Sequence, residues 1–260
     1  MPVPISALRL GTAWSRIAGL MDEAAESFVR TSFSSVVRDN WDMAVGLMDG
    51  AGRQFAQSSR SVPSFVGTMP VTLAAMLARI PAASLAEGDV LISNDGYLGT
   101  GHLNDITMIR PIFAERRIVA WIGSTFHATD IGGAPSVEAC DAWEEGLTIP
   151  VARILRGGVE NEDVLGFLEA NLRQPEEVLG DLRAQFAMYD QAAPRLLRIL
   201  SEEGFSSADA LSAEIFARSE RVMRQAIAAV PDGELPTRSP PMGLSIPSPS
   251  ACGWRSAAMR

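Results

Sequence analysis

Apolar side chains in the first thirty positions recur every three to four residues, which is the spacing of one helix face. They are Trp14, Ile17, Leu20, Met21, Ala24 and Phe28. The pattern predicts an amphipathic helix over about residues 13–33 that packs on a sheet.

Short apolar runs bounded by turn residues follow this helix. Residues 43–48 and 53–56 flank Asp49-Gly50, a pair suited to the tight turn of a β-hairpin. Pro70 fits the first position of another helix, which Pro81 ends. Residues 89–93 read as the next strand.

Residues 94–105 are rich in Asn, Asp and Gly, which favour turns and loops. Two β-type runs, 106–113 and 117–126, come next, joined by a short turn at Ala114 and Glu115, and a second glycine-rich loop covers 127–141. If the runs pair antiparallel, the end of the second returns beside the start of the first.

The character of the chain changes near residue 155. Residues 147–155 read as a strand, and helical periodicity dominates from 162 to about 230, with Pro194 expected to kink or divide it and Gly204 to cap it. We therefore predict an α+β fold. A mixed region with β-hairpins (1–155) precedes a mainly helical arm (156–233).

Composition narrows the class of protein. The 260 residues are 47% hydrophobic and 20% charged, with a net charge of -9. Such an acidic chain without clustered Lys and Arg is not expected to bind nucleic acid. No apolar run reaches membrane-spanning length, and the first 20 residues are a poor secretory signal. Two cysteines form no disulfide framework, so we expect a cytoplasmic protein.

The chain has two histidines, His102 and His127, and both lie at the ends of the predicted 106–126 hairpin. Asp105 follows His102 by three residues. Two imidazoles and a carboxylate can hold a divalent metal with coordination positions left open. The alternative is that both histidines are ordinary surface or core residues, and spacing alone leaves the two readings about equal.

Asn94, Asp95 and Asp130 are further candidates, either for orienting metal ligands or for binding substrate. Capping of loops by Asx turns explains them as well. Glu144 and Glu145 could act as a general base or simply occupy a solvated turn.

A catalytic cysteine and a nucleotide-binding site have weaker support in the sequence. Cys140 lies between acidic residues, which raise a thiol pKa, and reads as structural. The glycines at 99 and 101 lack the strand, helix and acidic residue of a dinucleotide site, so no cofactor-binding residue is assigned.

Longer motifs point to a family. GDVLISNDGYLGTGHLNDITMIRPIF, STFHATDIGG, EEGLTIPVARIL and ANLRQPEEVLGDLRAQ occur in this order, with RTSFSSVVRDNWD and SVPSFVGTMP before them. Together they resemble the hydantoinase B/oxoprolinase family over about residues 20–233. The family includes B subunits of N-methylhydantoinases, the corresponding half of 5-oxoprolinase, and subunits of acetone and acetophenone carboxylases.

The resemblance implies a metal at His102, Asp105 and His127, with manganese favoured over zinc or iron. It also implies a hetero-oligomer with a hydantoinase A-type subunit, which binds ATP and phosphorylates the substrate. The implied function is that of a B-type subunit of an ATP-dependent hydantoinase or 5-oxoprolinase, a hydrolase of cyclic amides. The first alternative is a subunit of an acetone- or acetophenone-type carboxylase acting on a ketone.

Three departures from the family pattern stand out. Asn94-Asp95-Gly96-Tyr97 replaces the common NDPY, and His127-Ala128-Thr129-Asp130 replaces the common HHAD; a single histidine there resembles the acetophenone carboxylase type. Family chains are about twice as long. Residues 234–260 lack folding periodicity, so we expect a truncated chain with a non-family tail, either disordered or produced by a frameshift. A catalytically inactive fragment is then a further alternative.

Overall fold

A computed structural model describes residues 6–134, 139 and 141–233. Cys140 and the tail 234–260, with its predicted disorder or frameshift, lie outside the described residues. Contact clustering divides the chain into Met1–Ser212 and Ala213–Arg260. In the second unit the described part is the remainder of helix α8 and residues 229–233.

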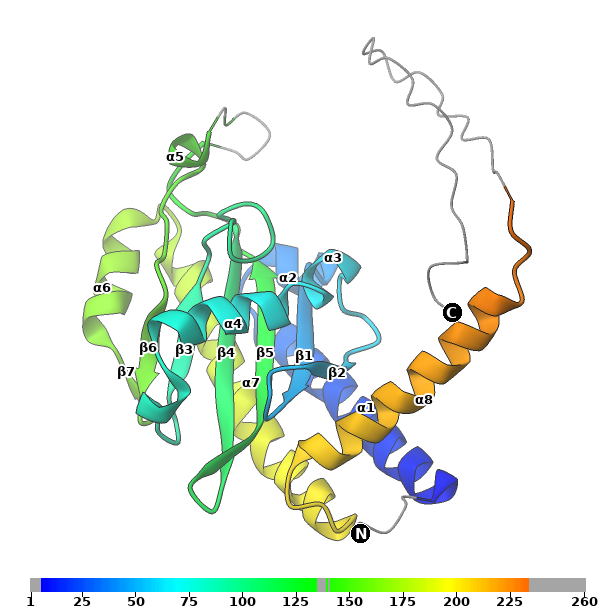
Figure 1. The fold of residues 1–260 in the computed structure, drawn as a ribbon. Helices are drawn as coiled ribbons and strands as arrows, with labels where there is room; N and C mark the ends of the chain where they lie inside the picture. The colour runs from blue at the N-terminus through cyan, green and yellow to red at the C-terminus, as the bar shows by residue number, and fades with distance from the viewer. Residues whose placement is uncertain (1–5, 135–138, 140, 234–260) are drawn as a thin grey trace. The chain divides into compact units, whose positions relative to one another are not determined.

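Within the described residues, seven strands form one antiparallel sheet in the order β2-β1-β5-β4-β3-β6-β7 (Figure 1). Their bounds are β1 Met43–Asp49, β2 Gln54–Gln57, β3 Val90–Ser93, β4 Asp105–Ala114, β5 Arg117–His127, β6 Ala152–Arg156 and β7 Val159–Glu160. The two predicted hairpins are therefore confirmed as β1–β2 and β4–β5, and β1 pairs with β5 between them.

Helices of the unit Met1–Ser212 cover both faces of the sheet, as Figure 1 shows. Their bounds are α1 Ala7–Thr31, α2 Ser35–Asn40, α3 Pro63–Val66, α4 Met69–Arg79, α5 Ala142–Glu145, α6 Glu162–Asn171, α7 Pro175–Glu202 and α8 Ala208–Ala228, with a 3-10 turn at Ala82–Ser84. The predicted α+β class is confirmed. Because both faces are covered, every residue of β1 is buried and the strand lacks alternation.

Each face has its own core. On the α4 face, Met69, Leu73 and Met76 pack with Ile109 and Trp121 of the sheet. On the opposite face, α1 and α7 lie side by side, and the rings of Phe28 and Phe126 meet edge to face at 6.1 Å. Adjacent residues of a strand point to opposite faces, so Phe126 on the α1 face puts the side chain of His127 on the α4 face.

The division at Ser212 differs from the change of character that the sequence places near residue 155. The reason is packing: α7 lies along α1 and contacts β4 and β5, so it belongs to the sheet's own unit. The Tyr189 hydroxyl donates to the carbonyl of Met108 at 2.9 Å and fixes α7 on the sheet.

Three predicted boundaries are wrong. The first helix begins at Ala7, capped by the Ser6 side chain, six residues earlier than predicted. Residues 147–151 are not a strand, because the carbonyl of Leu147 accepts from Asn94 and Pro150 has no N–H for a ladder. Pro194 does not divide α7, which runs unbroken to Glu202; buried neighbours on both sides hold it on α1 and the sheet.

The predicted C-cap at Gly204 is confirmed. Its φ of 70° is in the left-handed region, where glycine has no Cβ penalty. The next residue, Phe205, donates its N–H to the carbonyl of Leu200 at 2.7 Å and closes the helix end. No helix in the described part of the chain is long and apolar enough to cross a membrane.

Candidate metal centre

The register of the sheet brings the predicted ligands together. Asp105 begins β4 and pairs directly with His127, the last residue of β5. Directly opposed residues of antiparallel strands share a face of the sheet, so these two side chains are neighbours. His102 reaches them from the preceding loop, whose backbone turns back as its carbonyl accepts from the Asp105 N–H.

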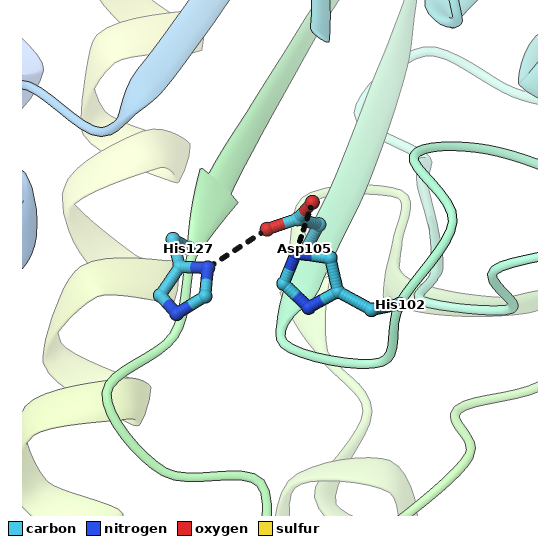
Figure 2. Close-up of side chains that lie close together, drawn as sticks. All are labelled: His102, Asp105 and His127. Atoms are coloured by element: carbon cyan, nitrogen blue, oxygen red, sulfur yellow. Dashed lines mark hydrogen bonds and ion pairs between the residues drawn. The ribbon is translucent and has the colours of Figure 1, made fainter. Parts of the chain in front are cut away.

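Figure 2 shows the Asp105 carboxylate between the two imidazole rings. His102 Nε2 lies 2.9 Å from Asp105 Oδ2, and His127 Nδ1 lies 3.0 Å from Asp105 Oδ1. The ring centroids are 5.2 Å apart. The Asp105 side chain is almost completely buried, whereas the imidazoles of His102 and His127 are 31% and 26% exposed and border solvent.

The electrostatics of Asp105 and His102 favour the charged form of both groups. Burial alone works to raise the pKa of Asp105, but hydrogen bonds to His102 and His127 outweigh it and place that pKa below its usual value. The hydrogen bond to Asp105 raises the pKa of His102, against the opposing effect of burial. Asp105 therefore stays ionised and attracts a cation.

These residues fit a divalent metal. One donor atom from each of His102, Asp105 and His127 can be chosen so that all three lie within 4.8 Å of one another. Donors about 2.1 Å from a shared ion lie roughly 3 to 4 Å apart, so small side-chain shifts suffice. Two nitrogens and one carboxylate oxygen suit manganese, zinc or iron.

Asn94 holds the surrounding loops together. Its side-chain amide donates to the carbonyls of Leu103 (2.7 Å) and Leu147 (2.9 Å), and its Oδ1 accepts from the N–H of Ile149 (2.5 Å). All of these groups belong to the backbone. Asn94 thus fixes the residue next to His102 through hydrogen bonds to the backbone.

Asp130 fixes the segment that follows His127. Its carboxylate accepts from the N–H groups of Gly132 (2.9 Å), Gln174 (3.0 Å) and Arg173 and from the Arg173 guanidinium. These backbone hydrogen bonds outweigh burial and lower the pKa of Asp130. The carboxylate therefore joins this loop to the start of α7.

Glu145 comes close to His102 through the same loops. Its Oε2 accepts from the Leu103 N–H at 2.9 Å, and its charge helps raise the pKa of His102. A Cβ on Gly133 would lie 2.2 Å from the Glu145 carbonyl, so only glycine permits this approach of the two loops. The sequence left the role of Glu145 open; the structure places it beside the candidate ligands.

A cleft of about 700 Å³ opens beside His102. Glu145, Asp95 and Asp141 line it, together with the strongly exposed rings of Tyr97 and Trp143. Asp95 Oδ1 accepts from the Tyr97 N–H at 3.0 Å and so holds this turn. Of the three orienting candidates, Asp95 is the one that faces the cleft.

Asp42, a residue that the sequence analysis missed, completes the row of polar side chains at this end of the sheet. Its carbonyl accepts from the His127 N–H at 3.0 Å, so it continues the β1–β5 register on the same face. Burial raises the pKa of Asp42, and its charge interacts with both histidines and Asp105. Asp42 reaches the site only because β1 pairs with β5, and nothing in the sequence near Asp42 reveals that pairing.

The fold and the donor set define an α+β protein with a candidate metal centre at one end of an antiparallel sheet. The family model described as Hydantoinase B/oxoprolinase matches residues 6–240, and the chain belongs to this family. The match extends beyond the residues 20–233 that the motifs indicated.

Relatives of known assignment cover more than one activity. The chain is 32% identical over 219 residues to a protein provisionally assigned as the B-type component of a D-/L-hydantoinase from Pseudomonas sp. (strain NS671), covering 82% of this chain and 37% of the relative. It is 29% identical to the acetophenone carboxylase delta subunit of Aromatoleum aromaticum (strain DSM 19018 / LMG 30748 / EbN1), over 58% of this chain and 23% of that subunit.

A solved structure supports the fold. The ATP-dependent caprolactamase from Pseudomonas jessenii matches with a TM-score of 0.79 and 26% identity, covering 89% of this chain and 40% of that one. The chain thus spans between about a quarter and two-fifths of the length of these relatives.

Proposed function

We propose that this chain is the metal-bearing part of a B-type subunit that hydrolyses a cyclic amide in an ATP-dependent complex. The single observation that carries the proposal is the Asp105 carboxylate held between the imidazoles of His102 and His127 beside an open cleft. Family membership supports it, since the family contains hydantoinase and oxoprolinase subunits.

In this proposal His102, Asp105 and His127 hold a divalent metal, and manganese is favoured by the family resemblance. When bound, the metal supplies Lewis-acid polarisation of a substrate oxygen. The rings of Tyr97 and Trp143 provide apolar area for an organic ring in the cleft, and Asp95 fixes the turn that carries Tyr97.

Glu145 is the residue placed to move a proton. One of its oxygens is held by the Leu103 N–H, which fixes the carboxylate at the cleft wall next to His102. The other oxygen can take a proton from water as it attacks the ring carbonyl, and return it to the ring nitrogen when the C–N bond breaks. Nucleotide chemistry comes from a hydantoinase A-type ATP-binding partner in a cytoplasmic hetero-oligomer.

A carboxylase subunit is the second candidate function. The observation that favours it is the single histidine in His127-Ala128-Thr129-Asp130, a pattern shared with the acetophenone carboxylase type, together with the similarity to the delta subunit of that enzyme. The same donors would then serve carbon–carbon bond formation at a ketone.

The test uses the complex isolated from the source cells through an affinity tag on this chain. Turnover of ATP is measured with hydantoin, 5-oxoproline, ε-caprolactam, and acetone or acetophenone with bicarbonate. We expect ATP-dependent release of a ring-opened product from a cyclic amide. Bicarbonate-dependent ATP turnover with a ketone, and none with the cyclic amides, would reject the hydrolase in favour of the carboxylase.

A further inference from the structure

Two buried polar atoms next to the candidate metal centre lack a hydrogen bond of good geometry within the described residues. They are the ring nitrogen Nδ1 of His102 and the side-chain oxygen Oδ1 of Asn104. Buried polar groups are almost always paired, because an unpaired one forfeits its hydration without compensation. A protonated ring nitrogen is a donor and an amide oxygen is an acceptor, so each of these atoms can supply the kind of partner that the other lacks.

The side chain of Asn104 cannot simply turn around. Its Nδ2 donates to the carbonyl of Ala128 at 3.1 Å, and the Ala128 N–H donates to the Asn104 carbonyl at 2.7 Å. These two hydrogen bonds tie the residue before Asp105 to the residue after His127. Because Nδ2 already donates to Ala128, Oδ1 is the side-chain atom that can accept a hydrogen bond from His102.

His102 needs such an acceptor if it is to bind a metal. Its Nε2 faces Asp105, so Nε2 is the nitrogen on the side of the candidate ligands. A neutral imidazole carries one proton, and a nitrogen that ligates a metal must be free of it. The proton then belongs on Nδ1, where an acceptor stabilises it.

We propose that Asn104 is a positioning residue whose Oδ1 accepts from His102 Nδ1–H, so that Nε2 can give up the proton it shares with Asp105 and ligate a metal. A side-chain interaction between Asn104 and His102 supports this geometry. The predicted effect on metal affinity rests on the proposed metal function. The predicted hydrogen bond between Asn104 and His102 does not.

The test uses the full 260-residue chain and has two arms. The first arm is metal-free: ¹⁵N NMR of the imidazole N–H groups at about pH 5.5, below the ordinary imidazole pKa, where both ring nitrogens carry protons. The chain has only two histidines, and the His127→Gln variant identifies their signals. The second arm measures Zn²⁺ affinity near neutral pH by competition with a chelating indicator.

Three substitutions separate the possible roles of Asn104. Asn104→Ala removes the acceptor and the bond to Ala128, Asn104→Leu does the same while keeping more volume, and Asn104→Asp keeps an acceptor but loses the donor to Ala128. Asn171→Ala is the control, because the exposed Asn171 side chain bonds only within α6 in the described residues.

In the wild-type chain and in Asn104→Asp we expect a His102 Nδ1–H signal that exchanges slowly with water. Asn104→Ala and Asn104→Leu should lose it and bind Zn²⁺ about 10- to 100-fold more weakly, the usual effect of removing such a partner. Asn104→Asp should remain within about threefold of wild type. Unfolding curves identify any variant that fails to fold, and the other apolar variant then supplies the result.

A slowly exchanging Nδ1–H in both apolar variants would overturn the proposal. Equal loss in Asn104→Asp and Asn104→Ala would also overturn it, because the bond to Ala128 would then be the part that matters. A wild-type chain that binds no Zn²⁺ would reject the proposed metal function, while the metal-free arm would still decide the role of Asn104.

Discussion

Asp49 and Asp105 are both buried aspartates at strand ends, but they lie at opposite ends of the sheet. Asp49 ends β1 opposite Ala120, whereas Asp105 begins β4 opposite His127. Their exposed fractions are 0% and 2%, so burial does not distinguish them. The difference between them is the chemistry of their partners.

Asp49 is surrounded by donors that keep their protons. Its carboxylate accepts from the N–H groups of Ala51 (3.1 Å) and Arg53 (2.9 Å), from the Arg53 guanidinium (2.9 Å) and from the Ser212 hydroxyl (2.7 Å). Arginine stays charged at any ordinary pH. Asp49 therefore closes the β1–β2 turn and joins it to Ser212 at the start of α8.

Asp105 is paired instead with two imidazoles, which can release protons and bind metals. A buried carboxylate whose donors always keep their protons serves the structure. A buried carboxylate beside a cleft, whose donors can release their protons, is a candidate metal ligand. Replacing each aspartate separately by a neutral residue distinguishes these two roles.

The largest effect is expected for Asp105→Asn, which keeps the shape and removes the charge. Mn²⁺ or Zn²⁺ affinity should fall at least about 100-fold, because both imidazoles lose the anion between them and the ion loses a ligand. Isothermal titration of the metal-free chain measures this. Asp163→Asn, which changes an exposed carboxylate in the first turn of α6, is the control. Stoichiometric binding by Asp105→Asn would contradict the site.

Asp49→Ala should give the opposite result, a loss of stability with metal affinity unchanged. We expect a destabilisation of about 2–3 kcal/mol, because two backbone N–H groups and Ser212 lose their acceptor. Urea unfolding measures it, with the exposed Asp39→Ala as control. A change below about 0.5 kcal/mol would show that the turn does not depend on this carboxylate.

Hydrophobic alternation and turn residues were enough to predict both hairpins and to bring His127 near Asp105. The β4–β5 turn lies at Glu115 and Arg116, one residue later than the predicted Ala114 and Glu115. The sequence also placed His102 in the loop just before this hairpin. Local sequence patterns gave wrong predictions where contacts between distant parts of the chain determine the structure. The run of α7 through Pro194 depends on packing against α1, and residues 147–151 are held by Asn94 instead of a ladder.

Asp42 and Asn104 could not be predicted for the same physical reason. Asp42 lies at the site only because β1 pairs with β5, two strands far apart in the sequence. Asn104 becomes distinctive only through its bonds to Ala128 and its unpaired Oδ1. Polar residues in loops give no local sign of which side-chain atom remains free.

A smaller effect than those of Asp105→Asn and Asp49→Ala is expected for the stability of the metal-free chain. The ion pair of Asp105 with His102 should make this stability depend on pH, by on the order of 1 kcal/mol. The folded pKa of Asp105 is lowered, so its contribution to stability is complete above the ordinary value of 3.8 and is lost as pH falls through the folded pKa. The folded pKa of His102 is raised, so its contribution is complete below 6.5 and is lost as pH rises through the folded pKa.

The stability of the pair should therefore be greatest between these two values. The measurement is the difference in unfolding free energy between wild type and His102→Gln in the presence of a chelator, as a function of pH. The difference should shrink as pH rises above 6.5 and through the raised pKa of His102, where the imidazole loses its charge. A difference that does not change with pH would mean that His102 and Asp105 do not interact as ions.

The smallest effect is expected for Asp42→Asn. Asp42 continues the row formed by His127 and Asp105, and its charge interacts with all three candidate ligands without belonging to their group. Its carboxylate should attract a bound cation through space, so the substitution should weaken Mn²⁺ binding about two- to fivefold, or roughly 0.4–0.9 kcal/mol. Titration of Mn²⁺ in low and high salt measures this, and the difference should shrink in high salt because screening weakens a through-space attraction. A loss as large as that of Asp105→Asn would instead make Asp42 a direct ligand and extend the site to a second carboxylate.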